Sequence, residues 1–363
     1  MHDIAIRGGV VIDGTGGPAR RGDIGITSGR VTAIGEVGPA RQTIEADGQV
    51  VAPGFVDVHT HIDAQVCWDT TLGPSSLHGV TTMLAGNCGF TLAPINDHEA
   101  DYLVRMLAIV EGMPLDALQA GVACTWTSTG EYLDHVDRGL AVNAGFMVGH
   151  SALRRVVMRE EATKRTATEA EIETMVRMLR AGLGAGALGF SSSYGIAHSD
   201  ANGDPVPSRF APVDELVALA RQCRDFPGTS LEFLPKFVDR FDPDQAALLS
   251  GLSVAAQRPL NWTCCASPSK SSPKRTRHCA SPITRKRKAA RSWASPCPSR
   301  HAPDSRSSPA SYSTRCRVGA TFWACHPSSA SWLFVIPMFV AASRSRRPPL
   351  PARCVRSPSG IDA

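Results

Sequence analysis

A run of short apolar segments, each followed by a stretch suited to a helix, constrains the fold of this 363-residue chain more than any other feature. The apolar segments lie at residues 55–58, 81–85, 145–148, 187–190, 230–233 and 259–262. Strands that alternate with helices pair in parallel, because each connecting helix returns the chain to the same end of the sheet. Residues 53–262 therefore predict an α/β fold with about six parallel strands.

Two of the connecting helices carry start signals. Thr168, with Glu171 three residues later, forms a capping box, and apolar residues then recur at helical spacing. Asp242 as N-cap and Pro243 in the first turn predict a second helix, which leads into residues 259–262. Ahead of these units, residues 1–52 alternate apolar residues with Gly-rich turns, a pattern typical of a small β-layer.

The composition changes abruptly after Trp262. Residues 263–363 hold 18 Lys and Arg against 2 Asp and Glu, a formal charge of +16, whereas residues 1–262 hold 20 against 31, a charge of −11. The same tail contains 7 of the 11 Cys but only 2 of the 32 Gly, and residues 263–320 show no sustained helix or strand period. The net charge of +5 therefore describes neither part of the chain.

Two interpretations of residues 263–363 stay open. The tail could be a basic, disordered segment whose run at residues 285–288 binds nucleic acid. It could instead be a shifted reading frame, since GC-rich coding DNA read out of phase spells Arg, Ser, Pro, Ala and Cys. Scattered Cys and Trp are unusual in disordered tails, which favours the shifted frame, so a nucleic-acid partner is not expected. Reading the other two frames from the Trp262 codon tests this hypothesis.

The first residues and the cysteine usage predict a cytoplasmic protein. Residues 1–6 contain neither a basic region nor a long apolar one, so no export is indicated. The apolar stretch at 332–342 is broken by Pro337 and is shorter than the roughly 20 residues of a membrane helix. Four scattered cysteines before the break are too few for a disulfide framework.

The strongest chemical signal is the pair His59 and His61 at the end of the first core strand. Alternate residues of a strand point to the same side, so both imidazoles can converge, and such nitrogens bind zinc at about 2.0–2.1 Å. The same sequence would also suit two buried histidines that hydrogen-bond to other protein groups and bind no metal. The position at the carboxyl end of a parallel strand, where barrel enzymes place their sites, favours a metal.

Cys88 closes the second strand, between Gly86 and Gly89. The glycines let the backbone turn sharply, which predicts an exposed sulfur at the same rim as the histidines. A thiolate there would be a zinc ligand and could bridge two ions. A small buried thiol is the alternative, and the neighbouring histidines favour the ligand.

Together these segments resemble the amidohydrolase superfamily, in particular its N-acyl-D-amino-acid deacylase (D-aminoacylase) branch. The resemblance is carried by IAIRGGVVIDGTG, GQVVAPGFVDVHTHID, GNCGF, GHSALR and GALGFSSSYG, and it ends at about residue 262. It implies a distorted (β/α)8 TIM-type barrel, incomplete at its C-terminal end, over residues 53–262. A small β-sandwich would occupy residues 1–52, with a separate tail at 263–363.

The resemblance also implies a zinc-dependent hydrolase of amide carbon–nitrogen bonds in small N-acylated amino acids. One or two Zn²⁺ ions would be held by His59, His61 and Cys88. The family has a histidine where this chain has Glu232, and this carboxylate either replaces it as a zinc ligand or pairs with Lys236. His150, in GHSALR, would contact the substrate or organise a loop.

Two departures bear on the reaction. The fourth strand lacks the metal-bridging lysine of other branches, which supports Cys88 as the bridge and disfavours a cyclic-amide hydrolase of the hydantoinase type. The family's general acid/base is an Asp on its last strand, but Asp304 and Asp362, the only acids of the tail, follow no apolar strand. The catalytic residue is thus unassigned. In addition, about six strands do not close an eight-stranded barrel, and the resulting open sheet edge predicts poor solubility and little hydrolysis. A non-catalytic metal-binding scaffold with a nucleic-acid-binding tail is the remaining alternative.

Overall fold

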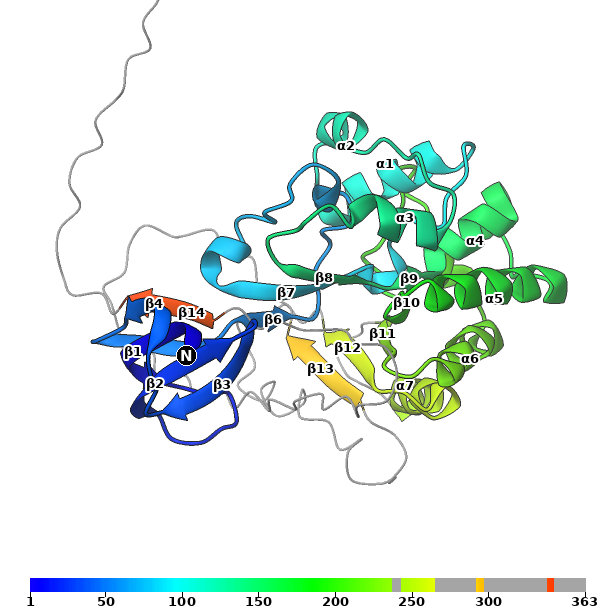
Figure 1. Ribbon diagram of the computed structural model, residues 1–363. Helices are drawn as coiled ribbons and strands as arrows, with labels where there is room; N and C mark the ends of the chain where they lie inside the picture. The colour runs from blue at the N-terminus through cyan, green and yellow to red at the C-terminus, as the bar shows by residue number, and fades with distance from the viewer. Residues whose placement is uncertain (237–242, 265–291, 297–337, 343–363) are drawn as a thin grey trace, which may run out of the picture. The chain divides into compact units, whose positions relative to one another are not determined.

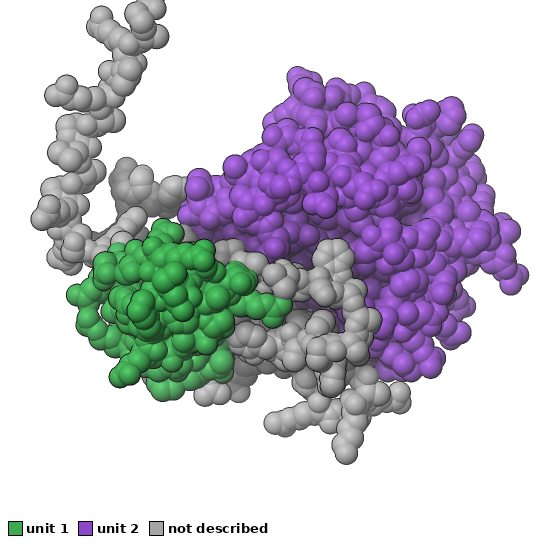
Figure 2. Space-filling view, in the orientation of Figure 1, with its two compact units in different colours: residues 1–53, 317–322, 335–363 green, residues 54–316, 323–334 purple. Residues whose placement is uncertain are grey.

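The computed structural model describes residues 1–236, 243–264, 292–296 and 338–342 (Figure 1). The chain divides into two compact units, one built on Met1–Pro53 and one that begins at Gly54 (Figure 2). The predicted N-cap Asp242, the basic run at 285–288, and both Asp304 and Asp362 lie outside the described residues.

The first unit is a sheet organised around β1. Its strands are β1 (His2–Val11), β2 (Arg20–Thr27), β3 (Arg30–Gly35), β4 (Ala40–Glu45), β5 (Gln49–Pro53) and β14 (Met338–Ala342). One edge of β1 pairs with β2, and the other pairs with β4 and then β5. A bulge after Ile6 places Gly8 at φ 73°, where its N–H donates to the Asp23 carboxylate. The predicted β-layer is thus one continuous hydrogen-bonded sheet, where the resemblance implied a sandwich.

The second unit carries parallel strands in chain order. They are β6 (Phe55–Asp57), β7 (Val80–Ala85), β8 (Asn143–Phe146), β9 (Val148–Gly149), β10 (Gly189–Ser193), β11 (Ser230–Leu234), β12 (Leu260–Cys264) and β13 (Ser292–Pro296). β6, β7 and β8 form one sheet, and β9 to β13 form a second. Every pairing within these sheets is parallel and joins successive strands. This order winds in one direction, as in a barrel, without the reversal of a doubly wound sheet.

Each of the six predicted core segments overlaps an observed strand, with the third split into β8 and β9 around Met147. The N–H of Leu188 donates to the carbonyl of Phe146 at 2.7 Å, which ties the chain entering β10 to the end of β8. Two strands of the tail were not predicted. β13 lies within residues 263–320, where no strand–helix unit was expected, and β14 lies beyond that range. They are held by hydrogen bonding to β12 and β5, which leaves no mark on the local apolar pattern.

The helices of the second unit follow the strands they connect. They are α1 (Ala100–Glu111), α2 (Leu115–Gly121), α3 (Thr129–Val136), α4 (His150–Met158), α5 (Glu169–Gly184), α6 (Val213–Gln222) and α7 (Pro243–Ala256). The capping box of α5 is confirmed, since Thr168 and Glu171 satisfy each other's backbone N–H groups. The start of α7 at Pro243 is also confirmed. No helix in the described ranges is long and apolar enough to span a membrane.

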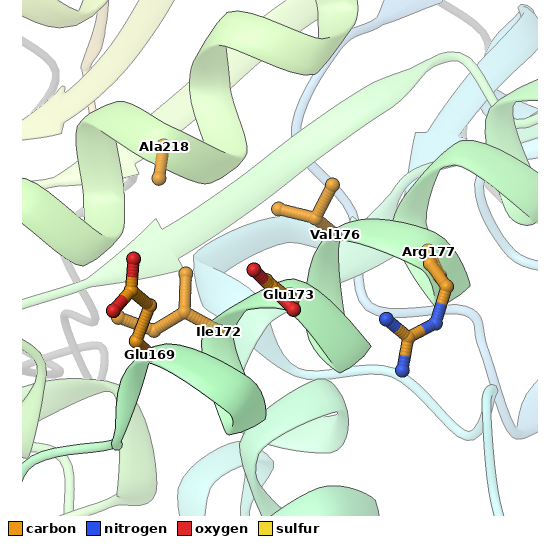
Figure 3. A pocket seen from close by; sticks show the side chains of 6 residues that line it. All are labelled: Glu169, Ile172, Glu173, Val176, Arg177 and Ala218. Carbon is orange, nitrogen blue, oxygen red and sulfur yellow. The ribbon is translucent and has the colours of Figure 1, made fainter.

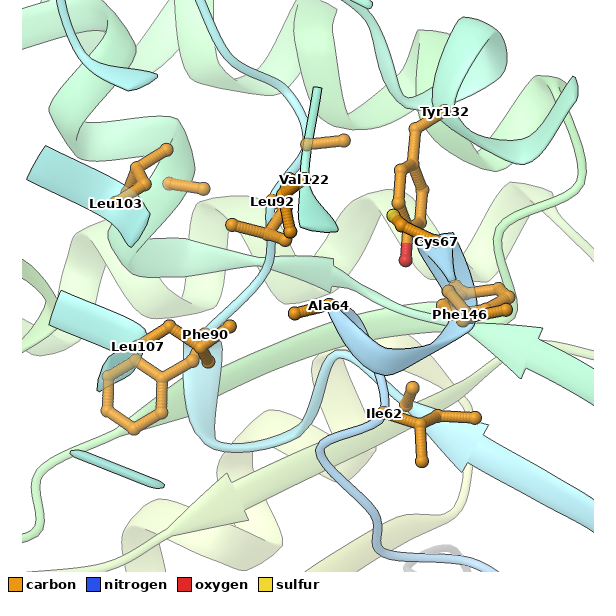
Figure 4. Packing of buried hydrophobic residues seen from close by; sticks show 14 of the residues in the cluster. Ile62, Ala64, Cys67, Phe90, Leu92, Leu103, Leu107, Val122, Tyr132 and Phe146 are labelled. Carbon is orange, nitrogen blue, oxygen red and sulfur yellow. The ribbon is translucent and has the colours of Figure 1, made fainter. Parts of the chain in front are cut away.

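Two apolar clusters hold these helices to the strands. The first joins α1 to the chain after β7, and Figure 4 shows its members Leu103 and Leu107 together with Phe90 and Leu92. The second joins α5, α6 and α7 to β10, β11 and β12. The apolar faces of the helices are buried in this packing, and polar side chains occupy the carboxyl ends of the strands. Parallel α/β folds place their functional sites at these ends.

Candidate metal centre

His59 and His61 lie in the segment that directly follows β6. Thr60, between them, fixes this segment to β7, because its N–H and its hydroxyl both donate to the carbonyl of Leu84, at 2.9 and 2.7 Å. The strand ends at Asp57, before both histidines, although the spacing predicted that they would lie on it. Both rings still converge. Their centroids are 5.2 Å apart, in an edge-to-face arrangement.

Cys88 lies in a tight turn, Asn87–Gly89, after β7. Its own φ is 56°, and Gly86 and Gly89 have φ of 76° and 79°, so three left-handed positions within four residues reverse the chain. A Cβ on Gly86 would lie 2.6 Å from the carbonyl oxygen of Met147, so only glycine fits there. The predicted exposure of the sulfur is wrong, because Cys88 is only 4% exposed.

Polar contacts from neighbouring strands turn Cys88 inward. The side-chain amide of Asn87 donates to the carbonyls of Thr60 and Leu84, at 3.1 and 2.9 Å. The N–H of Gly89 donates to the hydroxyl of Ser191 on β10 at 3.1 Å. The turn therefore leans across the carboxyl ends of the strands, and its thiol is enclosed by them.

The structure brings His59, His61 and Cys88 together. One ligand atom from each lies within 4.8 Å of the other two. Sγ of Cys88 is 3.4 Å from Nε2 of His59. Zinc bond lengths of about 2.0–2.3 Å in a tetrahedron separate two ligands by about 3.3–3.8 Å, so this pair already has the spacing that zinc requires. Two imidazoles and one thiol are also a donor set that zinc binds, leaving a position open.

Glu232 on β11 adjoins the cluster. Its carboxylate accepts the Cys88 N–H at 2.6 Å, and Oε1 lies 3.7 Å from Nδ1 of His59 and 3.9 Å from the Cys88 sulfur. Glu232 is 1% exposed, and no ion pair with Lys236 is found in the described part of the chain. Burial raises the pKa of Glu232 to about 8, against the opposing effect of the Cys88 N–H and the Thr263 hydroxyl.

Burial also sets the protonation of the two histidines. It lowers the pKa of His59 to about 4. It lowers the pKa of His61 to about 3, with the nearby His59 and His198 charges acting in the same direction. Both rings are therefore neutral at pH 7, which is the form that binds a metal ion.

Nδ1 of each histidine lies close to a residue that the sequence did not identify. Nδ1 of His59 is 2.8 Å from the hydroxyl of Thr263 on β12, and Nδ1 of His61 is 3.2 Å from Oε1 of Glu111 at the end of α1. Thr263 is the first residue after the change in composition. No local pattern marks either residue, because each reaches the cluster through the path of the chain in space.

His150, predicted to point toward the rim of the strands, lies inside the second unit. It begins α4 and is fully buried, with Nδ1 2.8 Å from the Ser192 hydroxyl and Nε2 2.8 Å from the Glu215 carboxylate. Arg154 donates to both oxygens of the same carboxylate at 2.6 Å. Both ring nitrogens of His150 thus have partners within the protein, at 2.8 Å each.

His198 is a further histidine at this rim that the sequence reasoning missed. Nδ1 is 3.0 Å from the hydroxyl of Ser193, the last residue of β10, and the ring stacks edge-on against Phe90 with centroids 4.9 Å apart. Burial, with the charges of Arg209 and His59, lowers its pKa to about 4. The sequence offered one indication of this placement, because His198 lies five residues beyond the end of β10, which overlaps a predicted strand.

Two hollows accompany the second unit. Figure 3 shows a groove of about 580 Å³ between α5 and α6, lined by Ile172, Val176 and Ala218 together with charged residues of α5. It contains no member of the metal cluster. A smaller hollow, of about 320 Å³, lies beyond β10 and β11 and is lined by Tyr194, Arg209 and Lys236 among others. Two cations thus border a space at the carboxyl ends of the strands.

Comparison with protein families matches residues 42–310 to the amidohydrolase family. A D-aminoacylase from Alcaligenes xylosoxydans xylosoxydans is 37% identical over 193 residues, which cover 52% of this chain and 37% of that protein. The matched segment thus spans well under two thirds of this relative.

Solved structures give a similar result. A D-aminoacylase described with a binuclear metal centre has a TM-score of 0.59 at 30% identity, covering 72% of this chain and 51% of that one. An N-acyl-D-glutamate deacylase from Bordetella bronchiseptica, complexed with zinc and a phosphonate inhibitor, has a TM-score of 0.56 at 30% identity and the same coverage. The chain spans about half the length of these structures.

Proposed function

Because the chain belongs to the amidohydrolase family, we propose that it is a metal-dependent hydrolase of the N-acyl-D-amino-acid deacylase type. One observation carries the proposal: His59, His61 and Cys88 come together at the carboxyl ends of the strands, with Glu232 against Cys88. The D-aminoacylase and deacylase relatives support the substrate class. The one-directional order of parallel strands supports a TIM-type barrel as the complete fold.

The metal ligands in this proposal are His59, His61 and Cys88, joined by Glu232. One or two Zn²⁺ ions are expected, because a thiolate can bridge two metals and the carboxylate supplies a further donor. A bound zinc ion would supply Lewis-acid polarisation of the amide carbonyl and would acidify water. A cytosolic location is part of the proposal, since a ligand thiol must stay reduced.

The protein's own groups prepare the site for this chemistry. Burial keeps both imidazoles neutral, so their nitrogen lone pairs are free to bind a cation. Glu232 keeps a proton at neutral pH in the metal-free chain, and releasing it adds a negative charge beside Cys88. The hollow bordered by Arg209 and Lys236 suits the carboxylate of an acylated amino acid better than a neutral cyclic amide.

The general acid/base is not assigned to any described residue, and the acids of the tail lie outside the described ranges. Proton transfer to the leaving nitrogen contributes typically 10²–10⁴-fold to such reactions. We therefore expect this chain to bind zinc and to hydrolyse N-acyl-D-amino acids slowly or not at all.

The test uses the purified full chain loaded with one or two equivalents of Zn²⁺, with His59→Ala as the control. Zinc binding should be tight and lost in the control, and N-acetyl-D-amino acids should be turned over in preference to hydantoin. Absence of zinc binding would contradict the metal site. Turnover of hydantoin alone would support a cyclic-amide hydrolase, and rapid zinc-dependent deacylation would contradict the expected low activity. Salt-sensitive DNA binding would instead support the scaffold alternative.

A further inference from the structure

The side chain of Glu111 lies beside His61, a histidine of the proposed metal site. Its Oε1 lies 3.2 Å from Nδ1 of His61, and the two side chains are 18% and 17% exposed. Nδ1 is buried, and no group in the described ranges is aligned for a hydrogen bond with it. Because a buried ring nitrogen needs a partner, a small rotation that brings Nδ1–H onto the carboxylate would be favourable.

His59 shows the arrangement that such a rotation would give to His61. Its Nδ1 is engaged by the Thr263 hydroxyl at 2.8 Å, while its Nε2 faces the Cys88 sulfur at 3.4 Å. The ring thus divides its nitrogens, one toward the protein and one toward the cluster. We propose that Glu111 imposes the same division on His61, as a positioning residue that accepts the Nδ1 proton and leaves Nε2 for the metal. The inference rests on the proposed metal site.

The placement of Glu111 is not explained by the helix that carries it. Glu111 is the last residue of α1, and Gly112 ends the helix in the left-handed conformation at φ 64°. A carboxylate at a helix C-terminus opposes the helix dipole, at a cost of about 0.3–1 kcal/mol. Lysine or arginine would be favoured there on helical grounds, so the acidic side chain points to another role.

The packing of α1 makes this placement firm. Leu103 and Leu107 belong to the large apolar cluster of the second unit, in company with Phe90, two residues beyond Cys88 (Figure 4). The helix therefore holds Glu111 in place through its buried face, 50 positions along the chain from His61. A carboxylate that accepts the second ring N–H of a metal-bound histidine fixes its tautomer and raises its basicity.

Zinc affinity of the full chain tests the consequence for the metal, measured by competition with a chromophoric chelator. Glu111→Ala should weaken zinc binding about 10–100-fold. Glu111→Gln should have a smaller effect, because its carbonyl oxygen can accept the same proton and its volume is conserved. Asp101→Asn removes an exposed carboxylate from the same helix and should leave the affinity unchanged. An affinity in Glu111→Ala equal to that of the wild type would overturn the proposal.

The tautomer of His61 gives a readout that needs no metal. In ¹⁵N-histidine-labelled, zinc-free chain, His61 should carry its proton on Nδ1, and Glu111→Ala should shift the proton toward Nε2. A wild-type His61 protonated on Nε2, or a tautomer unchanged by the substitution, would overturn the inference. A wild-type chain that binds no zinc would contradict the proposed function, and the tautomer would still decide the Glu111 contact.

Discussion

The backbone N–H of Cys88 donates to the carboxylate of Glu232 at 2.6 Å, although the two residues are 144 positions apart in the chain. This bond joins the turn after β7 to the middle of β11 inside the unit. The thiol of Cys88 is therefore oriented by a residue from a distant strand–helix unit, and the cluster requires the strand series through β11.

Removing the thiol should abolish tight metal binding. Cys88→Ala deletes one of the three clustered donors, so zinc affinity should fall by more than the roughly 10–100-fold expected for a supporting residue. Chelator competition measures the affinity, and a Co²⁺-loaded wild type should show a thiolate-to-metal charge-transfer band that the variant lacks. Cys124→Ala, a half-buried thiol outside the cluster, is the matched control. Equal losses in both variants would argue against Cys88 as a ligand.

Gly86 should tolerate no side chain. Gly86→Ala places a Cβ 2.6 Å from the carbonyl oxygen of Met147 at a φ of 76°, so it should destabilise the fold and displace Cys88. Gly203→Ala is the control, because φ there is 87° but nothing lies within 4 Å of the added carbon. The control should cost about 1–2 kcal/mol in urea unfolding, the penalty of the left-handed conformation alone. Gly86→Ala should cost clearly more and weaken zinc binding, and similar costs would rule out the steric argument.

The buried pair of Arg154 and Glu215 should matter far more than an exposed pair. Arg154→Met leaves the Glu215 carboxylate, fully buried beside His150, without its cation, and should cost about 3–5 kcal/mol. Arg165→Met removes a comparable contact with Glu171 at the surface and should cost less than about 1 kcal/mol. Urea unfolding of both variants measures the difference. If the double variant Arg154→Met/Glu215→Met is no more stable than Arg154→Met, an unpaired charge is not the cause.

Stability of the zinc-free chain should depend on the buried histidines. His59, His61 and His198 have pKa values lowered chiefly by burial to about 4, 3 and 4. Between the ordinary pKa of 6.5 and the lowered values, the rings bind protons in the unfolded chain but stay neutral in the folded chain. Their contribution to the free energy of unfolding is therefore complete above pH 6.5 and is lost as the pH falls toward 4. Linkage makes this on the order of a few kcal/mol for each ring.

His198→Gln isolates one of these contributions without touching a proposed ligand. The difference in unfolding free energy between wild type and variant should shrink by a few kcal/mol as the pH falls from 7 to 4. The reason is that the variant takes up one proton fewer than the wild type when it unfolds. The opposite pH trend of Glu232, whose pKa is raised, cancels in this difference. A difference that stays constant with pH would show that His198 is not protonated on unfolding in this range.

The parts of the site that the sequence predicts are those fixed by strand periodicity. His59, His61 and Cys88 follow consecutive parallel strands, so their convergence follows from the strand–helix order alone. The burial of Cys88 does not follow from this order, because it depends on contacts made by Ser191 and Glu232 from later strands. The same holds for the fold, where the order of the strands was predictable and the pairing of β13 with β12 was not.

The residues that support the metal cluster could not be predicted from the sequence, for a different reason. Glu111 reaches His61 only because α1 packs in one direction over the strands, and apolar spacing fixes the buried face of a helix without fixing where its end lies. His150 was read as a rim residue because its partner, Glu215, is 65 positions away. A polar side chain at a strand end can turn outward to a ligand or inward to a distant acid, and the local sequence is the same in both cases.

The order of the strands also bears on how the centre is assembled during synthesis. Within each of the two parallel sheets, every strand pairs with the one made before it, so a sheet can grow as the chain leaves the ribosome. All proposed ligands, with Glu111, lie before residue 235, ahead of the compositional change. A nascent chain that has released β11 therefore already carries the complete donor set. Zinc could then be captured during translation, before residues 263–363 are made.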